Sequence, residues 1–371
     1  MKFNYYMPTR IVAGRNCIEE NPQFLADLGQ RAFIMTGGSS VLKNGSLADL
    51  TTALDGQNIL WKHYTGVKPN PSLEDVRSAS HEAKVFGANF VVAIGGGSPM
   101  DAAKAVAVLA AGEVTDQELL SQRRFAKVLP LAVIPTTSGT GSEVTPYSIL
   151  TNDTLQTKSF LNTEQVYPAI AYLDGRYTLD LPAYITSATV VDALSHAVEG
   201  YLAARATPLS QTLALDSLGR IGTILPAMAQ GRVLDLAMRE SLLYASTLAG
   251  IVISQSGTTA VHAMGYSLTY FKGIDHGVAN GLLLARYLRY IFQTRPSEVM
   301  KILTTLGFTG IGELEEILHI LIGNYQLSDE DIVNFSRIAI QAGNILNTIP
   351  RPTQGDLVNI YRDSCGKRGT A

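Results

Sequence analysis

The first half of the chain alternates short apolar runs with amphipathic stretches. The stretch from about Ser72 to Phe86 predicts a helix, because Ser72 suits the N-cap position and acidic residues follow in the first turn. The apolar runs predict buried strands over residues 31–36, 58–64, 89–94 and 131–135. Strands that are apolar on both faces and alternate with helices indicate a parallel sheet with helices on both sides.

The second half has a different pattern, in which long Ala- and Leu-rich stretches follow helical spacing. They predict helices over about 184–203, 208–229, 233–254, 258–270, 277–292 and 329–346. The change falls near residue 180, and the chain length also favours two domains. We therefore predict an α/β domain over residues 1–180 and an all-helical domain over residues 181–371.

Composition narrows the functional classes. The 371 residues include 29 Lys plus Arg and 32 Asp plus Glu, with no block of like charge, so we expect neither nucleic acid nor an anionic membrane as a partner. Cys17 and Cys365 lie near opposite ends without paired spacing, which fits a reducing, cytoplasmic setting. The N-terminus does not read as a signal peptide, and we expect no apolar window near the ~20 residues that span a bilayer.

Two glycine-containing loops follow predicted strands. Gly95-Gly96-Gly97-Ser98 opens the helix that carries Asp101 and Lys104, and a helix N-terminus suits a pyrophosphate. It is not the G-x-G-x-x-G fingerprint, and a plain tight turn explains it equally well. Residues 135–143 (PTTSGTGSE) hold five hydroxyl side chains and two glycines, more polar groups than a simple turn needs. Because such loops adjoin at the carboxyl ends of parallel strands, together they predict one nucleotide site.

A set of ionisable residues in the second half has the composition of a metal site. Asp192 and His196 are four residues apart, on one face of a helix, and His262 and His276 have small or apolar neighbours. One carboxylate and three imidazoles suit Zn²⁺ or Fe²⁺ with one position open for a substrate oxygen. Each histidine alone is equally compatible with a buried residue bonded to a carbonyl. The other three are interpreted as ordinary residues: His63, His81 and His319.

In this order, the motifs resemble those of the iron-containing (group III) alcohol dehydrogenases over nearly the whole chain. They are FNYYMPT (3–9), VKPNP (67–71), GGGSPMDAAK (95–104), PTTSGTGSE (135–143), DALSHAVE (192–199), VHAM (261–264), HGVAN (276–280) and IPRP (349–352) with Ile360-Tyr361. The resemblance implies a dinucleotide-binding α/β domain with a parallel sheet, then an all-α metal-binding domain, as in dehydroquinate synthase-like folds. It also implies an active site between them and hydride transfer between NAD(P)(H) and a small alcohol or aldehyde.

Carried over position by position, the resemblance implies specific site residues. The metal, Fe²⁺ or alternatively Zn²⁺, would be held by Asp192, His196, His262 and His276. The cofactor phosphates would lie at Gly95, Gly96, Gly97 and Ser98. The rest of the cofactor site would include Asn70, Asp101, Thr136, Thr137, Ser142 and, near the adenosine ribose, Lys158. The usual assembly in this family is a homodimer, which we expect here in the cytoplasm.

Two positions depart from the family pattern. Many members carry a second histidine four residues after the one that matches His262, and here that position is Tyr266. A tyrosine can relay a proton, but its reference pKa of ~10 makes it a poorer base at neutral pH than histidine. Asp275 stands where proline is common, and it either bonds to a metal ligand or begins a helix. The candidate catalytic residues are therefore Tyr266, His262 and Asp275.

The choice of cofactor depends on the turn after the first predicted strand. An acid near the ribose 2′-OH often marks a preference for NAD, because it repels a 2′-phosphate. The turn Gly37-Gly38-Ser39-Ser40 carries no acid, and Lys43 or Lys158 would tolerate a phosphate. We therefore expect NADP(H) rather than NAD(H).

Three other functions stay open at this point. One is a zinc-dependent polyol (glycerol-type) dehydrogenase on the same fold. A dehydroquinate synthase-like lyase would need extra basic residues around a phosphorylated acidic substrate, and residues 192–280 show no such cluster. A non-catalytic nucleotide-binding protein is disfavoured because all four candidate ligands are kept.

Overall fold

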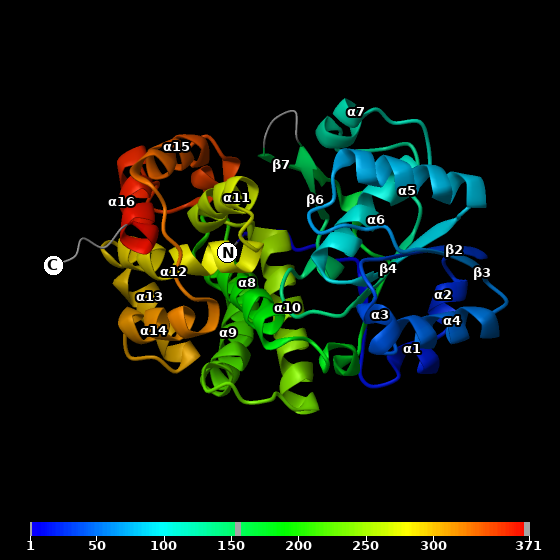
Figure 1. Cartoon of the computed structure of the whole chain (residues 1–371), viewed down its shortest axis with the longest axis horizontal. Helices are drawn as coiled ribbons and strands as arrows, with labels where there is room; N and C mark the ends of the chain where they lie inside the picture. Colours follow the sequence, from blue (N-terminus) through cyan, green and yellow to red (C-terminus); the bar gives the residue numbers. More distant parts are fainter. Residues whose placement is uncertain (1, 153–156, 367–371) are drawn as a thin grey trace. The chain divides into compact units, whose positions relative to one another are not determined.

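The computed structural model describes residues 2–152 and 157–366, and the contacts divide the chain into two compact units. The first, the sheet unit, comprises Tyr6–Leu181 and Asp235–Leu243. The second, the helical unit, comprises Met1–Tyr5, Pro182–Leu234 and Tyr244–Ala371. Figure 1 labels the elements of both.

Six parallel strands form the centre of the sheet unit, in the order β1-β8-β5-β4-β2-β3. Their bounds are β1 Arg10–Ala13, β2 Arg31–Thr36, β3 Leu60–Tyr64, β4 Phe90–Gly95, β5 Leu131–Pro135 and β8 Ile170–Leu173. The predicted parallel sheet is confirmed, with the four predicted strands as β2 to β5. The sequence pattern does not predict β1 and β8, because runs of four residues are too short to show a period.

Different helices cover the two faces of the sheet (Figure 1). Phe33 and Met35 of β2 pack towards α5 and α6, whereas Ala32 and Ile34 face the core that α1 and α4 help to build. Alternate side chains of a strand point to opposite faces, which explains the unbroken apolar runs. The helices of this unit are α1 Cys17–Glu20, α2 Gln23–Ala26, α3 Ser40–Lys43, α4 Ser46–Gly56, α5 Leu73–Phe86, α6 Gly97–Leu109 and α7 Asp116–Ser121.

The predicted start of α5 is confirmed, because Ser72 is its N-cap and forms a reciprocal capping box with Asp75. An antiparallel hairpin, β6 Tyr147–Asn152 and β7 Thr157–Asn162, stands apart from the main sheet. Short 3₁₀ helices occupy Ser142–Val144, Glu164–Val166 and Gly175–Thr178.

The strand order reverses direction between β2 and β4. The chain leaves β2 for the edge strand β3 and then returns to β4 on the other side of β2. Ligands of open α/β sheets bind at the carboxyl ends of strands where this reversal occurs. The loop after β2 starts at Gly37, and the loop after β4 starts at Gly96. β5 pairs with β4, so the loop that begins at Thr136 lies at the same edge.

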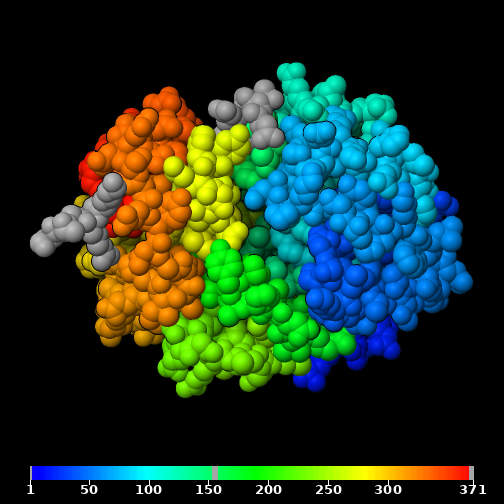
Figure 2. Space-filling view, viewed as in Figure 1, coloured from blue at the N-terminus to red at the C-terminus, as the bar shows by residue number. Residues whose placement is uncertain are grey.

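The helical unit confirms the second half of the fold prediction. Its helices are α8 Ala183–Leu202, α9 Pro208–Ala229, α11 Ala260–Lys272, α12 His276–Phe292, α13 Pro296–Leu306, α14 Ile311–Ile322, α15 Asp329–Ala339 and α16 Gln354–Cys365, with part of α10 Leu236–Ser256. Segments far apart in sequence share its surface, such as the green and the orange segments in Figure 2.

The predicted helix over 329–346 is wrong in its second half. α15 ends at Ala339, and a 3₁₀ helix, η4, follows over Gly343–Asn347. Ile345 in η4 is buried, so the apolar spacing continues although the α-helix does not. Periodicity alone therefore overestimates the length of α15.

Helix α10 corrects the expectation about membrane spans. Its 21 residues and a mean hydropathy of 1.3 make it long and apolar enough to cross a membrane by length and composition. Arg239 and Glu240 interrupt the apolar run near its start, which hides it in the sequence. Because 67% of its most apolar stretch is buried inside the protein, a core helix explains the same signal.

Candidate functional site

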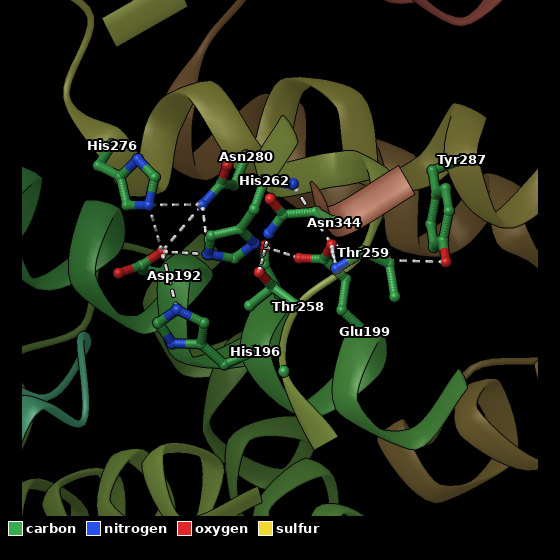
Figure 3. A network of polar contacts seen from close by, with 12 residues as sticks. Asp192, His196, Glu199, Thr258, Thr259, His262, His276, Asn280, Tyr287 and Asn344 are labelled. Atoms are coloured by element: carbon green, nitrogen blue, oxygen red, sulfur yellow. Dashed lines mark hydrogen bonds and ion pairs between the residues drawn. The ribbon is translucent and has the colours of Figure 1, made fainter. Parts of the chain in front are cut away.

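Four ionisable side chains from three helices of the helical unit converge, as Figure 3 shows. Asp192 and His196 come from α8, His262 from α11, and His276 is the first residue of α12. Oδ1 of Asp192 lies 3.9 Å from Nε2 of His196, 3.9 Å from Nε2 of His262 and 4.0 Å from Nε2 of His276. The structure thus brings together all four candidate ligands, which we call the Asp–His cluster.

Two glycines allow the three helices to come this close. A Cβ at Gly277 would lie 1.9 Å from the backbone oxygen of Ala188 on α8. A Cβ at Gly265 on α11 would lie 2.1 Å from Oδ1 of Asn280 on α12. A larger residue at position 277 would push α8 and α12 apart, and one at position 265 would displace the amide of Asn280, so these glycines allow the candidate ligand side chains to meet.

The Asp–His cluster is mostly buried and contains a negative charge on Asp192. Asp192, His196 and His262 are almost fully buried, whereas the side chain of His276 is 31% exposed. Burial favours a raised pKa for Asp192, but the three histidines outweigh it and hold the pKa below its usual value. Asp192 is therefore a carboxylate, and the cluster can be reached from the side of His276.

Asn280, one turn after His276 on α12, reaches into the cluster. Its Nδ2 lies 3.1 Å from Oδ1 of Asp192, 3.2 Å from Nε2 of His262 and 3.3 Å from Nε2 of His276. An amide NH₂ group has two hydrogens, so it donates to two of these three atoms at a time, and a contacted ring nitrogen accepts only in the matching tautomer. Asp192 and these two imidazoles nevertheless turn the contacted atoms towards one place. The motif gives Asn280 no role, although its i+4 spacing from His276 is a usable signal.

Glu199 is a second residue whose role the motif alone does not reveal. It lies on α8, is fully buried, and its carboxylate contacts Nδ1 of His262. Burial favours a raised pKa, but the interaction with His262 outweighs it and lowers the pKa of Glu199. Its spacing of three residues from His196 and seven from Asp192 places it on the same helix face.

The two candidate catalytic residues outside the cluster differ in their surroundings. The ring of Tyr266 stacks on that of His276, with centroids 5.6 Å apart and planes 9° apart, and it meets His262 edge-on at 6.4 Å. Asp275 is the N-cap of α12, and its carboxylate accepts a hydrogen bond from the hydroxyl of Tyr184. Of the two roles considered for Asp275, the structure shows the helix start.

In the sheet unit, the two glycine-containing loops pack against each other. A Cβ at Gly96 would lie 3.1 Å from Oγ1 of Thr137, and one at Gly97 would lie 2.6 Å from Cγ2 of Thr140. The main-chain N–H of Thr136 donates to the oxygen of Gly95 at 2.9 Å. α6 begins at Gly97, so the N–H groups of its first turn lie beside this junction.

Buried hydrogen bonds join α6 to the loop of residues 135–143. Oγ of Ser142 donates to Asp101 at 2.6 Å and accepts from Nζ of Lys104 at 2.7 Å. Lys104 also donates to Oγ1 of Thr145 at 3.1 Å and to the oxygen of Tyr147 at 2.7 Å. Complete burial lowers the pKa of Lys104 to about 8, although Asp101 opposes the shift. Lys104 is thus a structural member of this region that the motif analysis leaves without a role.

Asn70, Ser98 and Lys158 form a further group in the sheet unit. Lys158 on β7 donates to Oδ1 of Asn70 at 2.8 Å, and the main-chain N–H of Asn70 donates to Oγ of Ser98 at 3.2 Å. Ser98 lies in the first turn of α6, so the three candidate cofactor residues are brought together there. The turn after β2 is more open, and it exposes Gly38, Ser39, Ser40 and Lys43, with Gly37 half-buried.

Comparisons with known proteins cover both halves of the chain. The family model for iron-containing alcohol dehydrogenase matches residues 8–175, and the model for the C-terminal part of the Fe-containing alcohol dehydrogenase family matches residues 186–365. The sulfoacetaldehyde reductase of Bilophila wadsworthia is 30% identical over 380 residues, which covers 96% of this chain and 97% of that protein.

Two solved structures extend the similarity to the fold. The iron-containing alcohol dehydrogenase of Thermotoga maritima is 38% identical, with a TM-score of 0.91 over 98% of this chain and 99% of its own. The sulfoacetaldehyde reductase of Bifidobacterium kashiwanohense, solved in complex with NAD⁺, is 28% identical, with a TM-score of 0.88 over 99% of this chain and 100% of its own.

Proposed function

The chain belongs to the iron-containing alcohol dehydrogenase family, and on that premise we propose that the Asp–His cluster binds its catalytic metal. Membership makes the protein a nicotinamide-dependent oxidoreductase that acts on alcohols and aldehydes. The observation that carries the proposal is the convergence of one carboxylate and three imidazoles from three helices. The proposed ligands are Asp192, His196, His262 and His276.

The chemistry of the cluster fits a divalent cation. The candidate ligand atoms of Asp192, His196 and His262 all lie within 4.8 Å of one another. A carboxylate and imidazoles that converge at a buried place favour a positive charge there. Carboxylate and imidazole ligands suit both Fe²⁺ and Zn²⁺, so we propose Fe²⁺ on the family relationship and keep Zn²⁺ as the alternative.

The residues divide the chemical work between them. When bound, the metal supplies Lewis acidity towards the substrate oxygen. Asp192 offsets one unit of its charge, so a divalent centre keeps a net positive charge that favours an oxygen gaining electron density. Tyr266 lies beside His276, and its hydroxyl group can donate a proton. During aldehyde reduction, hydride from the reduced nicotinamide adds to the carbonyl carbon, and we propose that the O–H of Tyr266 donates the proton that converts the carbonyl oxygen into the hydroxyl of the alcohol.

For the nicotinamide cofactor we propose a site at the reversal point of the sheet. The glycines at positions 95–97 and the N-terminus of α6 provide backbone N–H groups for a pyrophosphate. The turn after β2 carries no acid and exposes Ser39, Ser40 and Lys43, which supports NADP(H) over NAD(H). The similar B. kashiwanohense reductase was solved with NAD⁺, so both cofactors need to be compared directly.

We propose a homodimer, as the resemblance to the family implies. We also propose a cytoplasmic location, which is compatible with the free, buried thiols of Cys17 and Cys365.

Anaerobic turnover tests the proposed function. The Fe²⁺-loaded protein is mixed with NADPH or NADH and a panel of short aldehydes that includes sulfoacetaldehyde, and chelated protein serves as the control. We expect oxidation of the cofactor that depends on the metal and is faster with NADPH. Equal rates after chelation would contradict the metal proposal. Preferential turnover of glycerol with NAD⁺ by the Zn²⁺ form would instead favour a polyol dehydrogenase.

A further inference from the structure

Glu199 lies behind the Asp–His cluster, on the side of His262 that faces away from Asp192 (Figure 3). Its side chain is 0% exposed, and an isolated buried carboxylate is strongly unfavourable. Oε2 contacts Nδ1 of His262, while Oε1 accepts from the main-chain N–H of Thr259 at 2.8 Å and from its hydroxyl at 2.7 Å. The charge of Glu199 is therefore satisfied by the imidazole of His262 and by the main-chain N–H and the hydroxyl of Thr259.

The contact with Glu199 decides which nitrogen of His262 carries the proton. A carboxylate only accepts, so Nδ1 must be the protonated nitrogen. In the neutral ring, which is the form that binds a metal, Nε2 then carries the lone pair, and it lies 3.9 Å from Oδ1 of Asp192 and 3.2 Å from Nδ2 of Asn280. We propose that Glu199 is a positioning residue that holds His262 in the metal-binding tautomer and thereby sets the metal affinity of the site. This rests on the proposed function of the Asp–His cluster.

The same carboxylate fixes where α11 begins. Within the described residues, the N-cap Thr259 makes no capping hydrogen bond with its own side chain. Glu199 takes over this role, because Oε1 accepts from the N–H of Thr259 and, at 3.3 Å, from the N–H of His262. A negative charge at a helix N-terminus is also favourable for the helix dipole. Both the position of His262 on α11 and the orientation of its ring therefore depend on Glu199.

Two hydroxyl groups connect Glu199 to α12, the third helix that carries candidate ligands. Oγ1 of Thr259 lies 3.0 Å from the hydroxyl of Tyr287 on α12. The single hydroxyl hydrogen of Thr259 goes to Glu199, so Tyr287 donates to Thr259. Glu199 on α8, Thr259 before α11 and Tyr287 on α12 thus tie together the three helices that supply the ligands.

Glu199→Gln separates this role from simple packing, because it keeps the size of the side chain. An amide has one acceptor oxygen, and three donors face Oε1 of Glu199. If the amide oxygen stays there, the NH₂ group faces Nδ1 of His262. Nδ1 must then accept, and the proton moves to Nε2, the atom that would bind the metal. If the amide turns, its NH₂ group opposes the N–H groups that begin α11.

The test measures Zn²⁺ affinity of the metal-free protein by competition with a chelating dye, and the tautomer of His262 by ¹⁵N NMR. We expect Glu199→Gln to weaken Zn²⁺ binding by ~10–100-fold and to place the proton on Nε2. Thr259→Val should have a smaller effect, because its main-chain N–H still donates to Glu199. The matched control is Glu315→Gln on α14, which pairs with Arg286 and Arg289 and should keep wild-type affinity.

The outcomes are distinct. Wild-type affinity in Glu199→Gln, with Nδ1 still protonated, would overturn the proposal, and so would an equal loss of affinity in Glu315→Gln. If Glu199→Gln does not fold, the tautomer of His262 in the metal-free wild type decides, because a proton on Nε2 in the ¹⁵N NMR spectrum would overturn the proposal. A wild-type protein that binds no Zn²⁺ and no Fe²⁺ would contradict the metal site itself, independently of Glu199.

Discussion

The loops around α6 and the Asp–His cluster are built on opposite principles. In the sheet unit, Ser142 bridges Asp101 and Lys104, so these buried polar groups satisfy one another. In the helical unit, Asp192 and three imidazoles turn acceptor atoms towards a common place. The polar groups of the first region are satisfied within the protein, whereas we propose that a cation completes the second. Ligand binding should therefore affect the stability of the two regions differently.

Removal of the metal should produce the largest difference in stability between the Asp–His cluster and the loops around α6. A protein saturated at a thousand times its Kd gains ~4 kcal/mol from the metal, and chelation removes that stabilisation. We expect hydrogen exchange to increase in α8, α11 and α12, which carry the ligands, and to change little in β2, β4 and β5. Equal loss of protection in the strands would contradict the idea that the two regions respond separately.

Gly277→Ala should damage the metal centre through the backbone. The added Cβ would lie 1.9 Å from the oxygen of Ala188 and 2.9 Å from Cβ of Asp192, so α12 must move away from α8. We expect a loss of about 3 kcal/mol in a urea melt, together with weaker metal binding. Gly312→Ala on α14 is the control, since among the described residues its Cβ meets nothing within 4 Å. Wild-type stability of Gly277→Ala would argue against the tight contact.

Gly96→Ala is the equivalent change in the sheet unit, and its expected effect is smaller. The added Cβ meets side-chain atoms of Thr137 at 3.1–3.3 Å, and that side chain can rotate. The protein should fold normally, but nucleotide dissociation constants should rise about tenfold, which is ~1.4 kcal/mol, because the phosphates lose their close approach. Calorimetric titration with NADPH checks this. Unchanged nucleotide affinity would count against a cofactor site at Gly96.

The smallest expected effect is on the pH dependence of stability in Lys104→Met, which is read as a slope because the variant also loses the three hydrogen bonds of Lys104. Burial lowers the pKa of Lys104 from 10.5 to about 8, so between these values the folded state binds fewer protons than the unfolded state. The contribution of this group to stability therefore rises as the pH increases from about 8 to 10.5. Melting temperatures should show this slope in the wild type and in the exposed control Lys127→Met, but not in Lys104→Met. An identical slope in Lys104→Met would show that Lys104 is not its source.

The sequence predicts the strands and the candidate ligands, but it does not predict the contacts between helices, and the reasons are physical. Strands β2 and β5 are recognisable because both faces are buried and the whole run is apolar. The four proposed ligand residues are recognisable because few types of side chain bind metals. The roles of Glu199 and Asn280 are not, because they depend on which helices meet, and Asn280 contacts Asp192 from 88 residues away. The helix α10 itself is predicted over 233–254, but two charged residues in its first turns hide that it is long and apolar enough to cross a membrane.

The most direct test of the central claim is the position of the metal. Crystals of the Fe²⁺-loaded protein, measured at the iron absorption edge, give an anomalous difference map that locates iron without reference to activity. We predict a single strong peak bounded by Asp192, His196, His262 and His276 and its absence in His262→Ala. A peak elsewhere in the chain, or an equally occupied site in His262→Ala, would contradict the assignment.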